Sequence, residues 1–283
     1  MTSPRSADRL LRDALRRVRA ELRFRVGRRA LRSAATPGPG CKIFVIGCGR
    51  SGTHWLGRTL AAHPQIHAEI EAPPVFGWVT RMALDPRSEA RLFPRLVERY
   101  RAGHALVQPR HYADKSHPNL WLAGALADAL PEARFIAIRR AVEPTVASML
   151  HHAGTRAWIE RWERYPIPNR FLGIGADLVE DYRVMSPAAR CALRVIAHSR
   201  EIERLRPRLG ARLAVVEYEA LLADPATVAE ALQRYLGLES PLRPPPPQHG
   251  RADRWRTVLS ARDRDDIRAL ARRLQAEDFL VAD

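Results

Sequence analysis

With 283 residues, 46% of them hydrophobic, the chain can form one large α/β domain or two small ones, and its formal net charge of +16 favours anionic partners without choosing among them. It has no run of 18 apolar residues and no apolar signal core at its start, so we expect neither a transmembrane helix nor a signal peptide. Its three cysteines (Cys41, Cys48 and Cys191) form neither a disulfide framework nor a metal-binding pair, which predicts a cytoplasmic protein.

Residues 1–40 are predicted to form a basic helical arm and a linker rich in Pro and Gly that ends it. Half of the net charge lies here, because residues 1–35 hold eleven Arg against three acidic residues. Over residues 7–34, apolar residues recur at helical spacing: Leu10, Leu11, Leu15, Val18, Leu22, Val26 and Ala30. One interpretation is an arm that contacts a partner or the inner face of a membrane. The other is an extra helix packed on the domain, with its arginines in solvent.

Residues 41–283 are predicted to form a single domain, which opens with a buried strand (42–46), a glycine loop (47–52) and a short helix (53–62). Two more strands are expected at 134–139 and 213–216, and helices at 86–102, 118–130, 143–152, 187–209, 225–236 and 260–275. Alternating strands and helices predict an α/β fold, a parallel sheet flanked by helices on both faces.

The glycine loop runs Gly-Cys-Gly-Arg-Ser-Gly-Thr-His over residues 47–54. Unpaired backbone N–H groups at the start of a helix bind anions, and glycines let the backbone approach them closely. Gly47, Gly49 and Gly52 also satisfy the G-x-G-x-x-G pattern of dinucleotide sites, which by itself is a weak signal. Thr53 stands where a Walker A loop has its lysine, which argues against an NTPase.

Residues 49–56 (G-R-S-G-T-H-W-L) resemble the 5′-phosphosulfate loop of sulfotransferases that use 3′-phosphoadenosine 5′-phosphosulfate (PAPS), usually P-R-S-G-T-T-W-L. The chain departs from that pattern at Gly49, where Pro is usual, and at His54, where Thr is usual. An imidazole still offers a donor to an anion. The resemblance implies that the following residues bind the phosphosulfate: Arg50, Ser51, Gly52, Thr53 and His54.

A second stretch is similar to the 3′-phosphate site of the same family, where an Arg at a strand end is followed by a Ser on the next helix. Here Arg140 follows the strand at 134–139, and Ser148 stands eight residues later. A phosphate dianion suits a guanidinium and a hydroxyl donor. Arg139 is an adjacent competitor for the role.

Two later segments extend the resemblance. Residues 216–225 resemble the family's R-Y-E-D-L-x-x-x-P segment, which implies that Tyr218 lies near the 3′ side of the nucleotide, although a core tyrosine is the alternative. Residues 250–255 resemble the late basic segment that closes over the nucleotide, which makes Arg254 a second candidate for the 3′-phosphate. Over 42–275 the resemblance implies the family's P-loop-like fold.

The catalytic candidates come from a closer resemblance to tyrosylprotein sulfotransferases and their bacterial relatives. Glu71 lies 21 residues after Arg50 and follows the A-H-P segment at 62–64, as the family's general base does. Glu69 is the fallback, since a strand would place it on the same face two residues earlier. Lys115 stands in a segment similar to D-K-x-P and would contact the sulfuryl oxygens.

The resemblance implies in-line transfer of a sulfuryl group from PAPS to an acceptor hydroxyl, leaving 3′-phosphoadenosine 5′-phosphate (PAP). Glu71 would take the hydroxyl proton, and Arg50 and Lys115 would stabilise the developing charge. No metal and no nucleic-acid partner are expected. The acceptor can be a saccharide, a lipid-linked glycan or a tyrosine. Its pocket is expected from residues 72–85 and 154–186, where Trp158, Trp162 and Tyr165 would stack a ring or pack in the core.

Two alternatives stay open. One is an NAD-dependent oxidoreductase that uses the G-x-G-x-x-G at 47–52, with Glu69 or Glu71 gripping a ribose. The other is a module that binds an anionic surface through its arginine-rich arm.

Overall fold

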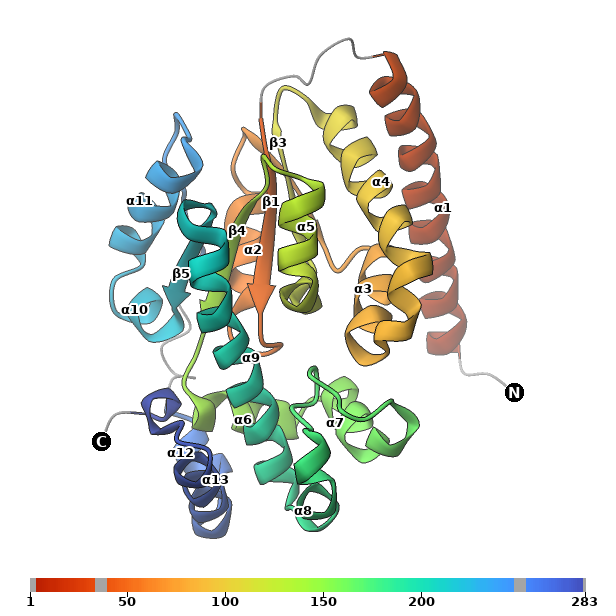
Figure 1. The fold of residues 1–283 in the computed structure, drawn as a ribbon. Coiled ribbons are helices and arrows are strands. Elements are labelled where there is room, and N and C mark those ends of the chain that lie inside the picture. Colours follow the sequence, from red (N-terminus) through yellow and green to blue (C-terminus); the bar gives the residue numbers. More distant parts are fainter. Residues whose placement is uncertain (1–3, 34–39, 247–252, 282–283) are drawn as a thin grey trace.

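The computed structural model describes residues 4–33, 40–246 and 253–281, and their centre is a parallel sheet of five strands (Figure 1). The strands are β1 (Lys42–Gly47), β2 (Ile66–Ile70), β3 (His111–Lys115), β4 (Arg134–Arg139) and β5 (Leu213–Glu217). They lie in the order β2-β3-β1-β4-β5, and every neighbouring pair is parallel. The predicted α/β fold in a single domain is confirmed.

The helices alternate with these strands along the chain, as crossover connections between parallel strands require. They are α1 (Pro4–Ser33), α2 (Thr53–Ala61), α3 (Val75–Leu84), α4 (Glu89–Val107), α5 (Ala123–Ala129), α6 (Val142–Leu150), α7 (Ala153–Glu160), α8 (Val179–Val184), α9 (Pro187–Leu209), α10 (Tyr218–Ala223), α11 (Pro225–Leu236), α12 (Trp255–Val258) and α13 (Ala261–Arg273). The helix expected at 118–130 is divided, because residues 117–122 form a 3-10 helix ahead of α5. Strands β2 and β3 were not predicted.

Strand β1 is buried on both faces because each face carries a layer of helices. Successive side chains of a strand point to opposite faces. Phe44 and Ile46 therefore join one apolar cluster with α4, α5 and α9, whereas Ile43 and Val45 join another with α2, α10 and α11. The two clusters hold the sheet between them and fix the direction in which its strand ends point.

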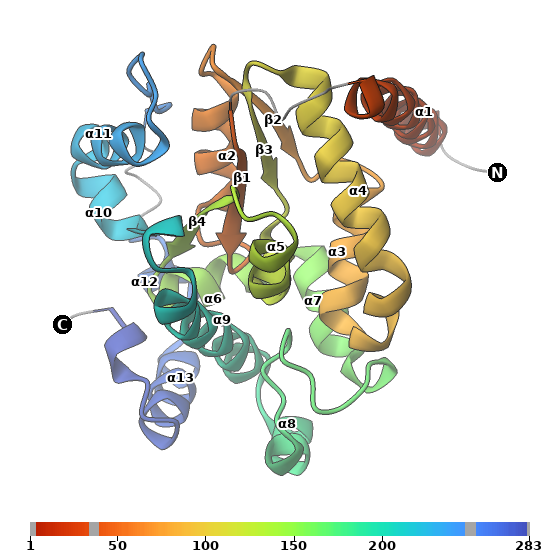
Figure 2. The same ribbon diagram turned by 45° about the horizontal axis from the view of Figure 1, so that its top comes forward.

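A third apolar cluster lies beyond the carboxyl ends of the strands, where α6, α7, α8, α12 and α13 gather around the lower half of α9 (Figures 1 and 2). Its large members include Trp162, Phe171, Tyr182 and Trp255. This layer faces the edge of the sheet at which a parallel α/β fold binds its ligands. The site is therefore expected between the strand ends and these helices.

Helix α1 lies along α4 at the outer edge of the molecule (Figures 1 and 2). The predicted linker at 36–39 and residues 250–252 of the late basic segment lie outside the described residues. None of the helices in the described ranges is long and apolar enough to cross a membrane.

Candidate active site

The predicted glycine loop joins β1 to α2, and its backbone is set for an anion. Gly52 has a left-handed backbone (φ 98°), and a Cβ there would lie 2.5 Å from the ring of Tyr218, so only glycine fits. The hydroxyl of Ser51 donates to the carbonyl of Cys48 at 2.6 Å and braces the turn. Thr53 begins α2, whose first N–H groups have no partner within the helix. This is the geometry expected for a phosphate loop.

The residues predicted to bind the 3′-phosphate meet the loop from other segments. Arg50 Nε donates to the Ser148 hydroxyl at 3.1 Å, and Arg140 Nη1 donates to the Arg50 carbonyl at 3.4 Å. The Arg140 guanidinium lies 4.4 Å from the centre of the Tyr218 ring. Burial lowers the pKa of Arg140, and its buried Nε has no hydrogen-bond partner among the described residues. The structure thus brings together four predicted residues from four segments.

The structure separates Arg140 from its neighbour Arg139. Arg139 is paired with Glu217 at 2.7 Å and with Glu203 at 2.6 Å, and these carboxylates outweigh its burial and raise its pKa. Since Glu217 is its register partner on β5, the sheet itself imposes this pairing. Arg139 is therefore committed to the fold, whereas Arg140 is available to an anion.

A cavity of about 280 Å³ adjoins Arg140 and is closed on one side by residues 278–281 near the C-terminus. Val281 N donates to the Glu143 carboxylate on α6 at 3.0 Å and holds that segment in place. No sequence motif marked this wall. Arg254, which precedes α12, is exposed, and no contact joins its side chain to Arg140 or Ser148 among the described residues.

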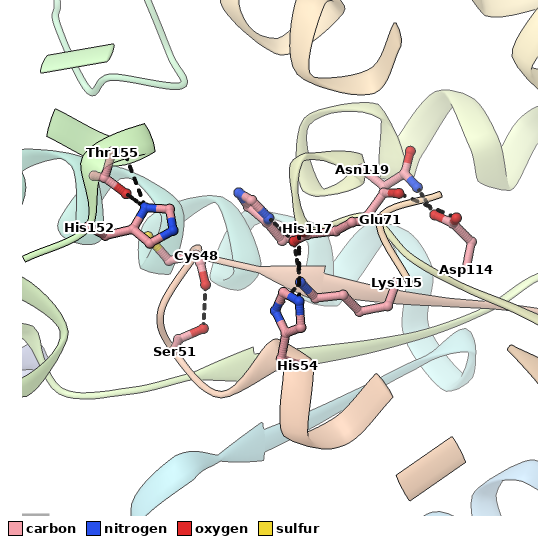
Figure 3. A network of polar contacts seen from close by, with 11 residues as sticks. Cys48, Ser51, His54, Glu71, Asp114, Lys115, His117, Asn119, His152 and Thr155 are labelled. Carbon is pink, nitrogen blue, oxygen red and sulfur yellow. Dashed lines mark hydrogen bonds and ion pairs between the residues drawn. The ribbon is translucent and has the colours of Figure 1, made fainter. Parts of the chain in front are cut away.

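The second half of the site is built around Lys115, which is 2% exposed at the end of β3. Its ammonium donates to Glu71 Oε1 at 2.5 Å and to His54 Nδ1 at 2.9 Å (Figure 3). Glu71 directly follows β2, the neighbour of β3, and its backbone is left-handed (φ 48°). Such strain in a non-glycine residue is typical of functional positions.

His117 completes this group, and sequence analysis did not identify it. Its buried ring places Nδ1 3.5 Å from Glu71 Oε1 (Figure 3). A Cβ at Gly49 would lie 3.0 Å from His117 Nε2, so the imidazole occupies the space into which a larger residue at 49 would project. The only signal in the sequence was the extra residue that separates Lys-Ser from Pro118 in the D-K-x-P-like segment.

The charges of this group are strongly coupled. Burial raises the pKa of the Glu71 carboxyl, but His117 and Lys115 outweigh it and lower that pKa to about 2. Burial lowers the pKa of Lys115, which Glu71 only partly offsets, and burial lowers the pKa of His117 to about 4. At neutral pH the pair is therefore a carboxylate and an ammonium beside a neutral imidazole.

Glu69 does not belong to this group. It accepts from the Tyr112 hydroxyl at 2.9 Å and pairs with Arg23 of α1 at 3.7 Å. The expectation that Glu69 and Glu71 share a strand face is wrong, because β2 ends at Ile70 and the chain turns at Glu71.

On the far side of His117 lies a cavity of about 430 Å³. It is lined by Phe76, Gly77, Thr80, Arg81, Leu84, Asp85, Arg164 and Tyr165. Both segments predicted to form the acceptor pocket thus contribute, and the Phe76 ring lies 5.7 Å from that of His117. Trp158 and Trp162 instead pack edge-on against Phe171 and Tyr182.

No three His, Cys, Asp or Glu side chains in the described ranges gather into a group that could hold a metal ion. A family model described as "Sulfotransferase family" matches residues 42–241 of the chain. The chain belongs to the sulfotransferase family. It is accordingly a PAPS-dependent sulfotransferase, and the alternative of an NAD-dependent oxidoreductase is set aside.

One solved structure shows the same fold as this sulfotransferase, and a second is more distantly similar. A sulfotransferase from Alicyclobacillus acidocaldarius matches with a TM-score of 0.53 and 18% identity, covering 88% of this chain and 98% of that one. A mouse sulfotransferase, SULT7A1 in complex with PAP, has a TM-score of 0.42 and 16% identity over 81% of this chain and 68% of that one. No curated protein matches the chain.

Proposed function

We propose that this sulfotransferase moves the sulfuryl group of PAPS to a hydroxyl of an acceptor bound beside α3, with Glu71 as the general base. The observation that carries the proposal is the position of the Lys115–Glu71 pair. It touches the phosphate loop through His54 on one side and the Phe76 cavity through His117 on the other. A transfer centre must contact both substrates in this way.

The residues around the loop fit a nucleotide that carries two anionic groups. Arg140 donates to the backbone carbonyl of Arg50, neither arginine forms an ion pair within the described residues, and the Nε of Arg140 has no partner there. A phosphate would provide the missing acceptor atoms. We assign the 3′-phosphate to Arg140 and Ser148, beside Tyr218, and the phosphosulfate to residues 50–54.

When bound, PAPS supplies a sulfuryl group on a good leaving group. Lys115 would turn from Glu71 toward the sulfuryl oxygens, and Arg50 would stabilise charge on the same group. Losing the ammonium contact raises the pKa of Glu71 from its low resting value, because that contact is one cause of the depression. Glu71 is then a better base for the acceptor proton, a contribution of roughly 10²–10⁴ in rate.

The cavity beside α3 favours an acceptor that combines a ring with a negative charge. Phe76 and Tyr165 offer flat apolar surfaces to a sugar or a phenol. Arg81 and Arg164 lie at the exposed rim, and neither has an ion-pair partner within the described ranges. The Thr80 hydroxyl is buried and also has no partner there, so a polar group of the acceptor would satisfy it.

The test of the nucleotide site is calorimetric binding of PAP to the wild type and to two matched variants, Arg140→Ala and Arg139→Ala. We expect Arg140→Ala to weaken PAP binding by about 10- to 100-fold, because a charge-assisted pair with phosphate is lost. Arg139→Ala should change the affinity by less than about threefold, since its guanidinium is held by two glutamates. NAD should not bind.

Absence of PAP binding, or equal losses in the two variants, would contradict the assignment. Once PAP binding is established, labelled PAPS allows a screen of phenols and saccharides, each with and without a carboxylate or sulfate group, for the acceptor.

A further inference from the structure

Helix α1 is fixed to the domain by polar contacts along one face. Arg99 of α4 donates to the Glu21 carboxylate at 3.1 Å, and its guanidinium lies 4.4 Å from the centre of the Phe24 ring. Arg28 pairs with Glu98 of α4 at 2.8 Å. The arm is therefore a packed helix, as one of the two interpretations of the sequence expected.

The two helices approach closely at Gly27. A Cβ at that position would lie 2.3 Å from the carbonyl oxygen of Ala102, so the contact depends on the missing side chain. The face toward α4 is thus built from Gly27, Phe24 and charged side chains. Four of the apolar residues that recur at helical spacing, Leu15, Val18, Leu22 and Val26, stay exposed and are not part of it.

The apolar stripe of α1 points to solvent on the opposite face. Leu15, Val18, Leu22 and Val26 are 59%, 58%, 57% and 52% exposed, and spacings of three and four residues align them along the helix. Outside α1, the only large hydrophobic side chain so exposed in the described ranges is Val184. In both views no described element lies beyond α1 (Figures 1 and 2).

Arginines border this stripe. At 3.6 residues per turn, Arg19 and Arg25 flank it on opposite sides, and Arg29 continues it toward the end of the helix. Arg25 pairs weakly with Glu21 at 3.7 Å, whereas Arg19 and Arg29 have no acidic partner in the described part of the chain. The exposed surface therefore combines an apolar ridge with uncompensated positive charge.

We propose that this face of α1 docks onto an anionic lipid surface, with the apolar stripe entering the boundary between headgroups and acyl chains. An amphipathic helix with apolar residues on one side and arginines beside them is the form that binds such interfaces. Each arginine near an anionic membrane adds attraction that salt weakens. A second copy of the chain fits less well, because two such faces would bring their arginines together.

The docking is independent of the acceptor and of the roles given to the site residues. Since α1 is already a helix packed on α4, the lipid-binding face is present in the folded enzyme and needs no folding of the arm. The binding free energy is then not reduced by the cost of ordering a disordered segment.

The experiment measures co-sedimentation of the full chain with phosphatidylserine-rich vesicles and with pure phosphatidylcholine vesicles. We expect binding to the first only, weakened by salt. The double variant Val18→Glu/Leu22→Glu should lower the partition by at least about tenfold. Val184→Glu, which places one glutamate at a still more exposed apolar position of α8, should not change it.

A second pair of double variants tests whether the position of the arginines matters, rather than the total charge of the protein. Arg19→Gln/Arg29→Gln should lower the partition by about tenfold, whereas Arg110→Gln/Arg262→Gln, at exposed arginines of other segments, should change it little. PAP affinity, which should be equal in all variants, checks that they fold.

Three results would overturn the proposal. They are no binding of the wild type to either vesicle, binding that the two glutamates leave unchanged, and a dimer in light scattering that the same glutamates dissociate. The last would assign the stripe to a second copy of the chain.

Discussion

The two halves of the site handle charge in opposite ways. Around Lys115 each charge has a partner within the protein, since the ammonium contacts Glu71 and His54 and the carboxylate also meets His117. Around Arg140 neither cation forms an ion pair among the described residues, since Arg140 donates to the Arg50 carbonyl and Arg50 donates to the Ser148 hydroxyl. Arg50 and Arg140 in the nucleotide half are thus free to pair with an anionic ligand, whereas Lys115 and Glu71 in the transfer half stay paired until one of their contacts opens.

This difference separates binding from chemistry. A half with unpaired cations gains most when an anion arrives, so its residues should set affinity. A half with paired charges gains little from binding, but a change of partner during the reaction alters its proton affinity, so its residues should set rate. Variants that keep shape and remove charge test this division.

The largest effect is expected for Glu71→Gln. The amide keeps the size of the side chain and cannot take the acceptor proton, so kcat should fall by roughly 10²–10⁴ while PAP affinity changes by less than about threefold. Transfer from labelled PAPS and calorimetry measure the two quantities. Equal losses in both would mean that Glu71 positions the nucleotide, and the proposed division would fail.

A smaller effect is expected in stability from Asp114, a fully buried carboxyl next to Lys115. It accepts from the Tyr100 hydroxyl at 3.1 Å and from Asn119 at 2.9 Å, yet burial and the charge of Glu69 raise its pKa to about 7. The folded state therefore holds a proton that the unfolded state releases near pH 4.

Between about pH 4 and pH 7 this group's contribution to the free energy of unfolding falls as the pH rises, and above pH 7 it is constant. Asp114→Asn removes the titration. The wild type should therefore lose roughly 3–4 kcal/mol relative to the variant over that range. Urea unfolding at several pH values measures it, and a constant difference would show that the buried carboxyl is not protonated.

The smallest effect is expected for His54→Thr, which restores the usual residue of the family. The imidazole is half exposed, and burial and Lys115 lower its pKa, so at neutral pH it offers a single N–H donor, as a hydroxyl does. PAP affinity should change by less than about threefold. A loss above tenfold in calorimetry would show that His54 binds as a cation and would place it in the nucleotide half.

The sequence predicted the sheet class and the strands that are buried throughout. The limits of β4 and of α9 agree with the structure, because apolar runs and a Pro after a capping Ser mark them clearly. Strands β2 and β3 were missed because polar residues break their pattern, and these include Glu69, Asp114 and Lys115. These polar residues belong to the site and its surroundings. In strands of five residues they leave no apolar pattern that would have indicated a strand.

Within the site, motifs predicted which residues meet but not which of two neighbours acts. The resemblance favoured Arg140 and left Arg139 as a competitor, and the register with β5 shows that Arg139 is the one paired with Glu217. The periodicity of α1 likewise gave the helix and its stripe but not its orientation. Arg99 and the close approach at Gly27 decided which face packs.

The contact between Gly49 and His117 couples two positions that lie 68 residues apart in the chain. A proline in the loop and the imidazole of His117 would compete for the same space, so a larger residue at 49 requires a change at His117. We therefore expect that the proline usual in the family's loop can be accepted at 49 only after the imidazole at 117 is lost, which constrains the order of substitutions. We therefore expect substitutions at Gly49 and His117 to be epistatic, and a transplantation of the usual loop into this chain would have to change both positions together.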